Sequence, residues 1–153
     1  MADRKLSPNF KLSEFTDSQT AARRGIDNTP DAESLRNLQR LARTLEDVRV
    51  VLGDVPIRIS SGYRSAELNR AVGGAKNSAH TRGLAVDFTA PAFGSVLATA
   101  KAVAKSGVAF DQIIHEYGQW VHLAIPAEDA RPRGELLSIA KGTGYQPGLK
   151  TLA

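Results

Sequence analysis

The stretch Ser78-Ala-His80-Thr-Arg-Gly83-Leu-Ala-Val-Asp87 decides how the centre of this chain folds. Gly83 predicts a break in the backbone, and residues 84–90 then alternate bulky with small side chains, as a half-buried strand does. Successive side chains of a strand point to opposite faces, so Asp87 shares its face with the small residues. The opposite face carries the bulky apolar residues Leu84, Val86 and Phe88. We therefore expect Asp87 on the open face of a sheet whose other face fills a core.

A second run with the same alternation, residues 120–125, carries His122 on the face opposite its bulky apolar residues. His80, Asp87 and His122 together supply two imidazoles and one carboxylate. This is the ligand set of catalytic zinc sites in which a fourth position stays open for water. Taken singly, each residue is more often packed, capping or solvated, because short motifs often arise by chance. The chain has no cysteine, so any metal must be held by nitrogen and oxygen. The combination predicts hydrolytic chemistry.

Helical and extended segments surround these two strands. Residues 31–52 predict a long amphipathic helix, because apolar residues recur at helical spacing between Pro30 and Gly53. The other predicted elements are short helical pieces over 10–24, a strand over 55–59, a helix over 65–72, a helix from Pro91 to Gly107 and a hairpin of 110–117 with 120–125. Residues 135–140 fit either a helix or an edge strand. These elements predict an α+β fold with helices beside a mainly antiparallel sheet.

Length and composition narrow the class of protein. The 153 residues contain no repeat or linker and predict a single domain over residues 1–153. The net charge of +4 is spread along the chain and no nucleic-acid motif occurs, so we expect no nucleic-acid partner. No secretory signal and no apolar run long enough for a membrane span is present. We expect a protein that is made in the cytoplasm.

Several further motifs accompany the candidate ligands in a fixed order. They are Phe10-Lys-Leu-Ser-Glu-Phe15, Ile26-Asp-Asn28-Thr-Pro30, Ser61-Gly-Tyr63-Arg64-Ser65, Leu68-Asn69 with Ala71-Val72-Gly73-Gly74, Glu116-Tyr117-Gly118, and Gly144-Tyr145. With the two ligand motifs, the chain resembles over nearly its whole length the M15 peptidases. These are the zinc D-Ala-D-Ala carboxypeptidases and phage L-Ala-D-Glu endopeptidases that cut peptidoglycan stems. The resemblance implies a Hedgehog/DD-peptidase-like fold without a separate cell-wall-binding module.

The resemblance also implies roles for particular residues. It makes His80, Asp87 and His122 the ligands of one zinc ion, and Arg64 the cation that contacts the substrate carbonyl or its developing oxyanion. Peptide hydrolysis further needs a general base and acid. One form of the family has an acidic residue three positions before the last histidine, but this chain has Gln119 there.

Glu116 is our candidate for the general base. In a hairpin with a three-residue loop, Glu116 pairs with Trp120 and Ile114 pairs with His122, which places Glu116 and His122 on one face. A two-residue loop would change this pairing. His115 would point to the opposite face, and we interpret it as a structural or surface residue.

Four other residues receive weaker assignments. Ser78 matches a family serine that hydrogen-bonds substrate, although it also suits a turn. Tyr63 and Trp120 are candidates for the wall of the substrate cleft, with core packing as the alternative for both. Arg82 is interpreted as a surface charge.

The sequence therefore predicts a zinc metallopeptidase that hydrolyses peptidoglycan stem peptides, as a monomeric phage or prophage endolysin. Carboxypeptidase and endopeptidase versions share these ligands, and both stay open. Such a protein is made in the cytoplasm of the bacterial host and acts on the cell wall after release. The alternative is a catalytically silent, zinc-bearing binding or structural domain of a phage particle.

Overall fold

A six-stranded sheet forms the centre of the computed structural model, which describes residues 3–152. Its strands lie in the order β3-β4-β6-β5-β7-β8, and only β5 and β7 run parallel. Their bounds are β3 Arg58–Ser61, β4 Ala85–Thr89, β5 Gln112–Glu116, β6 Trp120–Ala124, β7 Glu135–Ile139 and β8 Gln146–Pro147. The predicted α+β fold with a mainly antiparallel sheet is confirmed.

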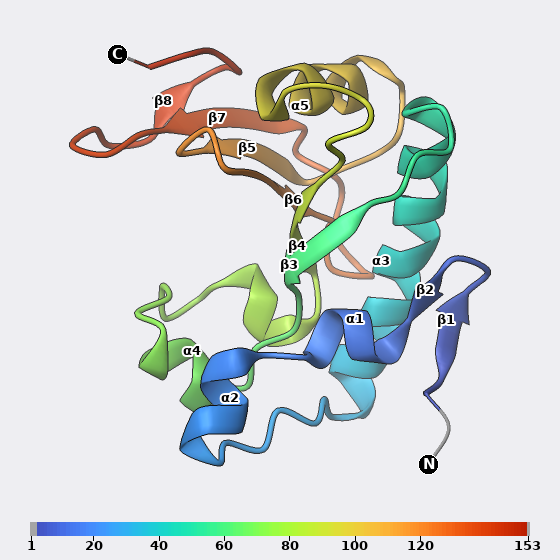
Figure 1. Ribbon diagram of the computed structural model, residues 1–153, viewed down its shortest axis with the longest axis vertical. Helices are drawn as coiled ribbons and strands as arrows, with labels where there is room; N and C mark the ends of the chain where they lie inside the picture. Colours follow the sequence, from blue (N-terminus) through green and yellow to red (C-terminus); the bar gives the residue numbers. More distant parts are fainter. Residues whose placement is uncertain (1–2, 153) are drawn as a thin grey trace.

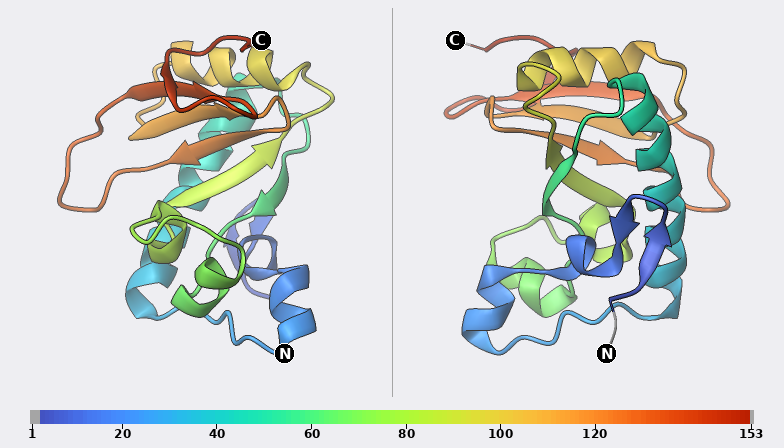
Figure 2. Two further views of the ribbon diagram at one scale, coloured as in Figure 1. Left: turned by 90° about the vertical axis from the view of Figure 1, so that its left-hand side faces the viewer. Right: turned by 45° about the vertical axis from the view of Figure 1, so that its right-hand side comes forward.

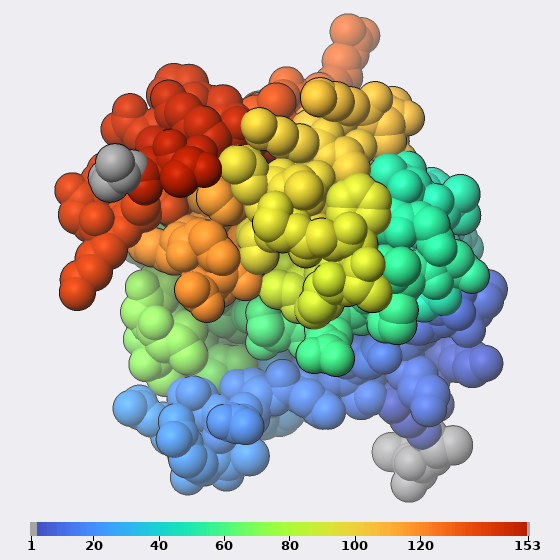
Figure 3. Space-filling view, turned by 45° about the horizontal axis from the view of Figure 1, so that its top comes forward, coloured from blue at the N-terminus to red at the C-terminus, as the bar shows by residue number. Residues whose placement is uncertain are grey.

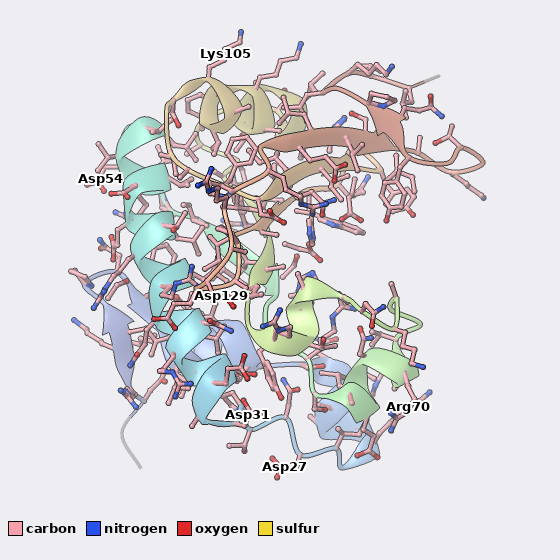
Figure 4. The ribbon with its side chains drawn as sticks, turned by 180° about the vertical axis from the view of Figure 1, so that it is seen from behind. Asp27, Asp31, Asp54, Arg70, Lys105 and Asp129 are labelled. Atoms are coloured by element: carbon pink, nitrogen blue, oxygen red, sulfur yellow. The ribbon has the colours of Figure 1, made fainter. Side chains whose placement is uncertain are left out.

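Two helices cover one face of this sheet. Helix α3 (Ala32–Val51) runs along one side of the molecule, and α5 (Val96–Lys105) packs on β5 and β6 (Figures 1 and 2). Asp31 caps α3 by accepting a 2.8 Å hydrogen bond from the Ser34 amide, and Asp54 lies beyond the other end (Figure 4). Figure 3 shows α5 seated between α3 and the C-terminal strands.

The core lies between the helices and this face of the sheet. Its largest fully buried side chains include four from α3 and four from the strands: Leu38, Leu41, Leu45, Val48, Val86, Phe88, Ile113 and Leu123. Burial of each such side chain away from water stabilises the folded state by about 1.5–3 kcal/mol. Strand alternation turns Asp87 and His122 to the other face, so the packing of the core places both on the open side of the sheet.

The N-terminal part of the chain crosses below the sheet in short elements (Figure 1). Helices α1 (Leu12–Thr16) and α2 (Gln19–Arg24) confirm the predicted helical pieces, and Ser18 caps α2. Strands β1 (Lys5–Ser7) and β2 (Phe10–Lys11) form a small hairpin that the sequence did not predict. Within residues 3–152, no helix combines the length and apolar character that a membrane crossing needs.

Two further helical segments hold the loops that approach the open face. Helix α4 (Ala66–Ala71) agrees with the prediction, and the 3-10 turn η1 (Ala79–Arg82) ends at Gly83. Gly83 has φ 72°, and a Cβ there would lie 2.6 Å from the Ser34 carbonyl oxygen, so only glycine fits. Helix α5 begins at Val96 rather than after Pro91, because Ser95 provides the N-terminal cap.

Candidate metal centre

His80, Asp87 and His122 meet on the open face of the sheet. One ligand atom from each lies within 4.8 Å of the other two. Asp87 Oδ1 is 3.3 Å from His80 Nε2 and 3.0 Å from His122 Nδ1. Both imidazoles are buried, and Asp87 is 9% exposed. The sequence prediction that these three residues come together is therefore met by the fold.

Strand pairing fixes two of the three side chains, and hydrogen bonds of a 3-10 turn fix the third. Asp87 in β4 and His122 in β6 are direct partners in the antiparallel register, which brings their side chains together on one face. His80 lies in η1, where the Ser78 hydroxyl accepts a 3.2 Å hydrogen bond from the His80 amide. His80 Nδ1 lies 2.7 Å from the Gly62 carbonyl oxygen, to which it donates. That contact leaves Nε2 free to face Asp87.

The arrangement fits a divalent metal ion. Ligand bonds of about 2.0–2.2 Å in a tetrahedron place neighbouring ligand atoms about 3.3–3.6 Å apart, slightly more than the 3.3 and 3.0 Å from Asp87 to the two histidines. Burial lowers the pKa of His80, which favours the neutral imidazole that binds metal. Burial opposes ionisation of Asp87, but the hydrogen bond from His122 and the nearness of His80 outweigh it and hold its pKa below the usual range. Two imidazoles and one carboxylate could therefore hold a metal ion here.

Glu116 stands beside this group. It pairs with Trp120 across the β5–β6 hairpin, and Ile114 pairs with His122, as expected for the three-residue loop. Glu116 Oε1 lies 3.6 Å from His122 Nδ1. Burial raises the pKa of Glu116, and the charge of Asp87 adds to this, while His122 acts in the opposite direction. Gln119, in contrast, is exposed in the turn between β5 and β6, and it does not line the hollow that contains the candidate ligands.

Arg64 approaches the same group from the loop after β3. Its amide donates to the His80 carbonyl oxygen at 3.0 Å, which ties the loop to η1. Burial lowers the pKa of the guanidinium, and the charges of Asp87 and Glu116 oppose that shift. Arg64 Nε is buried without a hydrogen-bond partner among the described residues. The Arg64 side chain as a whole is only partly buried and lines the hollow with the candidate ligands, where a guanidinium is suited to bind a substrate oxygen.

The remaining candidates occupy different surroundings. Ser78 lines the hollow that contains the three candidate ligands, and it also caps η1. Trp120 lines the same hollow; its Nε1 is buried without a hydrogen bond in the described chain, although it lies near enough to Glu116 to lower that pKa. Tyr63 packs against the hydrophobic core, where burial raises its pKa, and it also lines a neighbouring hollow beside Arg64, so both alternatives for it stay open.

Two residues that we interpreted as structural have contacts of that kind. His115 Nδ1 lies 3.1 Å from the Lys150 carbonyl oxygen, on the side of β5 away from the candidate ligands. Arg82 is exposed and forms a 3.3 Å ion pair with Glu33.

Asn28 is a site-supporting residue to which the sequence analysis gave no role. Its Nδ2 donates to the carbonyl oxygens of Thr16 and Tyr63 at 2.9 and 3.0 Å. Its Oδ1 accepts a 2.7 Å hydrogen bond from the Ser65 amide. Asn28 thus clamps the residues on both sides of Arg64. The motif containing Asn28 was visible in the sequence, but its target, a loop distant along the chain, was not.

Comparison with protein families agrees with this site. The model of the family described as Peptidase M15 matches residues 8–124, which include every candidate ligand, Arg64 and Glu116. The chain belongs to the Peptidase M15 family. Its members are metal-dependent peptidases, and the buried His-Asp-His group is where this chain could hold the metal. A comparison with curated proteins gave no match.

Proposed function

We propose that this chain is a zinc peptidase that hydrolyses peptide bonds in the stem peptides of peptidoglycan. The carboxylate of Glu116, 3.6 Å from His122 Nδ1 and on the same face of the sheet, is the observation that carries the proposal. A buried three-residue ligand set alone suits a structural or a catalytic ion. A partly buried carboxylate with a raised pKa beside that set is what proton transfer requires.

His80 Nε2, His122 Nδ1 and Asp87 hold the ion in this proposal. Zinc bound there supplies Lewis acidity, which polarises the scissile carbonyl and makes water a stronger nucleophile near neutral pH. Zinc is favoured because the donors are two imidazoles and one carboxylate, with room for a fourth ligand.

Glu116 and Arg64 carry out the remaining steps. Glu116 takes a proton from the attacking water and delivers it to the leaving amine. Hydroxyl adds to the carbonyl carbon, the C–N bond breaks, and the products are a carboxylic acid and an amine. The Arg64 guanidinium donates to the carbonyl oxygen, where negative charge develops. Ser78 and Trp120 contact the substrate from the walls of the hollow.

The resemblance to peptidoglycan peptidases supports the choice of substrate. We infer that the protein acts as a monomeric phage or prophage endolysin. It is made in the cytoplasm of the bacterial host and reaches the cell wall after release.

The alternative is a zinc-bearing domain of a phage particle without catalysis. Its support is Gln119, which stands where one form of the family has an acidic residue and which cannot act as a general base. The enzyme is favoured because Glu116 is partly buried beside His122 and can transfer the proton. The exposed Gln119 is then not needed for that role.

Turnover of purified peptidoglycan with added zinc tests the proposal, with released products identified by mass spectrometry. Wild type and Glu116→Gln are compared, with Gln119→Ala as the control from the same hairpin. Glu116→Gln keeps the shape of the side chain but removes the base, so activity falls about 10²–10⁴-fold. Gln119→Ala retains activity. A folded, zinc-loaded wild type that releases nothing favours the silent domain.

A further inference from the structure

Two hollows open on either side of Arg64 along the face of the sheet. The first, about 500 Å³, is lined by α2 and its preceding loop and by the end of β3. The second, about 570 Å³, contains the three candidate ligands and Glu116. Arg64, Val72 and Asp87 line both, so the two hollows adjoin at these residues, and we call the two together the groove.

The order of strands shows where the metal centre lies along this groove. Ser60 and Ser61 of β3 line the first hollow, Asp87 of β4 lines both, and His122 of β6 and Glu116 of β5 line the second. Beyond β5, the second hollow continues to Arg133 and Tyr145, which flank β7. The groove therefore crosses the strands, and the candidate ligands lie between its two ends.

The charges in the groove do not suit a free carboxyl terminus. Among the described residues that line it, the only lysine or arginine side chains are Arg64 and Arg133. Arg133 is already bound to Asp111, at 2.8 Å from Nη2 to Oδ2, with Nε donating to the same carboxylate. Arg64 lies where the hollows meet, and the end beyond it carries Asp17. A terminal carboxylate at that end would meet an acidic side chain rather than a free cation.

The size of the hollows leads to the same conclusion. Each falls within the 300–1,000 Å³ that is usual for a site holding a whole small ligand. A single terminal residue would leave most of either hollow unfilled, whereas a peptide chain that continues in both directions would occupy both.

We infer that this chain is an endopeptidase, which binds its peptide across the whole groove and cuts a bond inside it. The inference rests on the proposed function and selects between its two versions. One water is consumed: its hydroxyl joins the carbonyl carbon, and its proton goes to the nitrogen of the departing peptide. Both products are peptides rather than one peptide and one free amino acid.

The first test compares two synthetic stem peptides that differ only at the carboxyl end, one a free acid and one an amide. An endopeptidase cleaves both at similar rates, into fragments whose masses add up to that of the peptide plus one water. A carboxypeptidase releases one amino acid from the free acid. Its kcat/KM on the amide is at least about tenfold lower, because the terminal negative charge that it binds is absent. That result overturns the inference but keeps the peptidase. If neither peptide nor whole peptidoglycan is cut, the proposed function itself fails.

A second test blocks the first hollow. Gln19→Trp places an indole in that hollow, away from the candidate ligands, and Ala22→Trp places one at an exposed position of α2 outside the groove. We expect kcat/KM on the amide peptide to fall at least about tenfold for Gln19→Trp and to stay unchanged for Ala22→Trp. Equal activity of both variants means that substrate does not occupy the first hollow, which contradicts the inference.

Discussion

Gly62 lies where the N-terminal segment presses against the loop that supports His80. In Gly62→Ala, the new Cβ would lie 2.5 Å from the Phe15 carbonyl oxygen and 2.7 Å from Phe15 Cα. Both are backbone atoms, so no side chain can rotate away. The same carbonyl oxygen accepts a 2.7 Å hydrogen bond from the Tyr63 amide, which holds the two segments together. The substitution therefore forces residue 62 away from Phe15.

Two quantities change as a result. Overpacking of this kind costs about 1–3 kcal/mol, so the free energy of unfolding of the metal-free protein falls by that amount. Moving residue 62 also moves the carbonyl oxygen that accepts from His80 Nδ1. Loss of such a supporting hydrogen bond typically weakens metal binding about 10–100-fold, and we expect the zinc Kd to rise by that factor.

Urea unfolding with a chelator present measures the first quantity, and competition with a chromogenic zinc chelator measures the second. Gly144→Ala is the matched control, because its Cβ would have no neighbour within 4 Å, and both quantities stay at their wild-type values. A Gly62→Ala protein with wild-type stability and zinc affinity would refute the reasoning that this close approach positions His80.

Three other predictions concern the clamp, acid stability and metal binding. Asn28→Ala removes three hydrogen bonds to backbone groups, so we expect the free energy of unfolding, measured in urea, to fall by about 1–3 kcal/mol. An unchanged free energy of unfolding contradicts the role of Asn28 as a clamp. Hydrogen bonds from Arg133 lower the pKa of Asp111, so this pair stabilises the fold above about pH 4 and loses its effect as pH falls through the native pKa. The stability difference between wild type and Asp111→Asn therefore shrinks between about pH 5 and pH 2 in urea unfolding, and a constant difference refutes the assignment. Zinc at about 100 times its Kd adds about 2.7 kcal/mol to the free energy of unfolding and raises Tm. A chelator abolishes this effect, and His122→Ala lacks it. An equal rise of Tm in His122→Ala means that zinc binds elsewhere.

Local patterns were sufficient for the central strands and for the candidate ligands. Alternation of bulky and small residues placed Asp87 and His122 on the open face, because a buried sheet face admits few polar side chains. The hairpin length then placed Glu116 on that face as well, since register follows from the loop once the pairing is antiparallel.

Other elements depended on partners far along the chain. Residues 135–140 fit a helix or a strand by pattern, and pairing of β7 with β5 decides for a strand, because strand formation depends on the neighbouring edge. The β1–β2 hairpin was missed for a similar reason. Helix α3 packs against β1, and Glu46 of α3 accepts hydrogen bonds from Ser7 and from the amide of Asn9, which no local pattern reveals.

The sequence by itself determined the α+β class and the candidate ligand set, because both follow from side-chain chemistry and short-range periodicity. It placed Glu116 and His122 on one face only for a three-residue loop, and the structure has that loop. Only the tertiary structure decided that Asn28 clamps the Arg64 loop, that the Gly62 carbonyl oxygen accepts from His80, and that two hollows adjoin at Arg64. These features join segments distant in sequence. Their geometry arises when the core packs, and local propensity does not encode it.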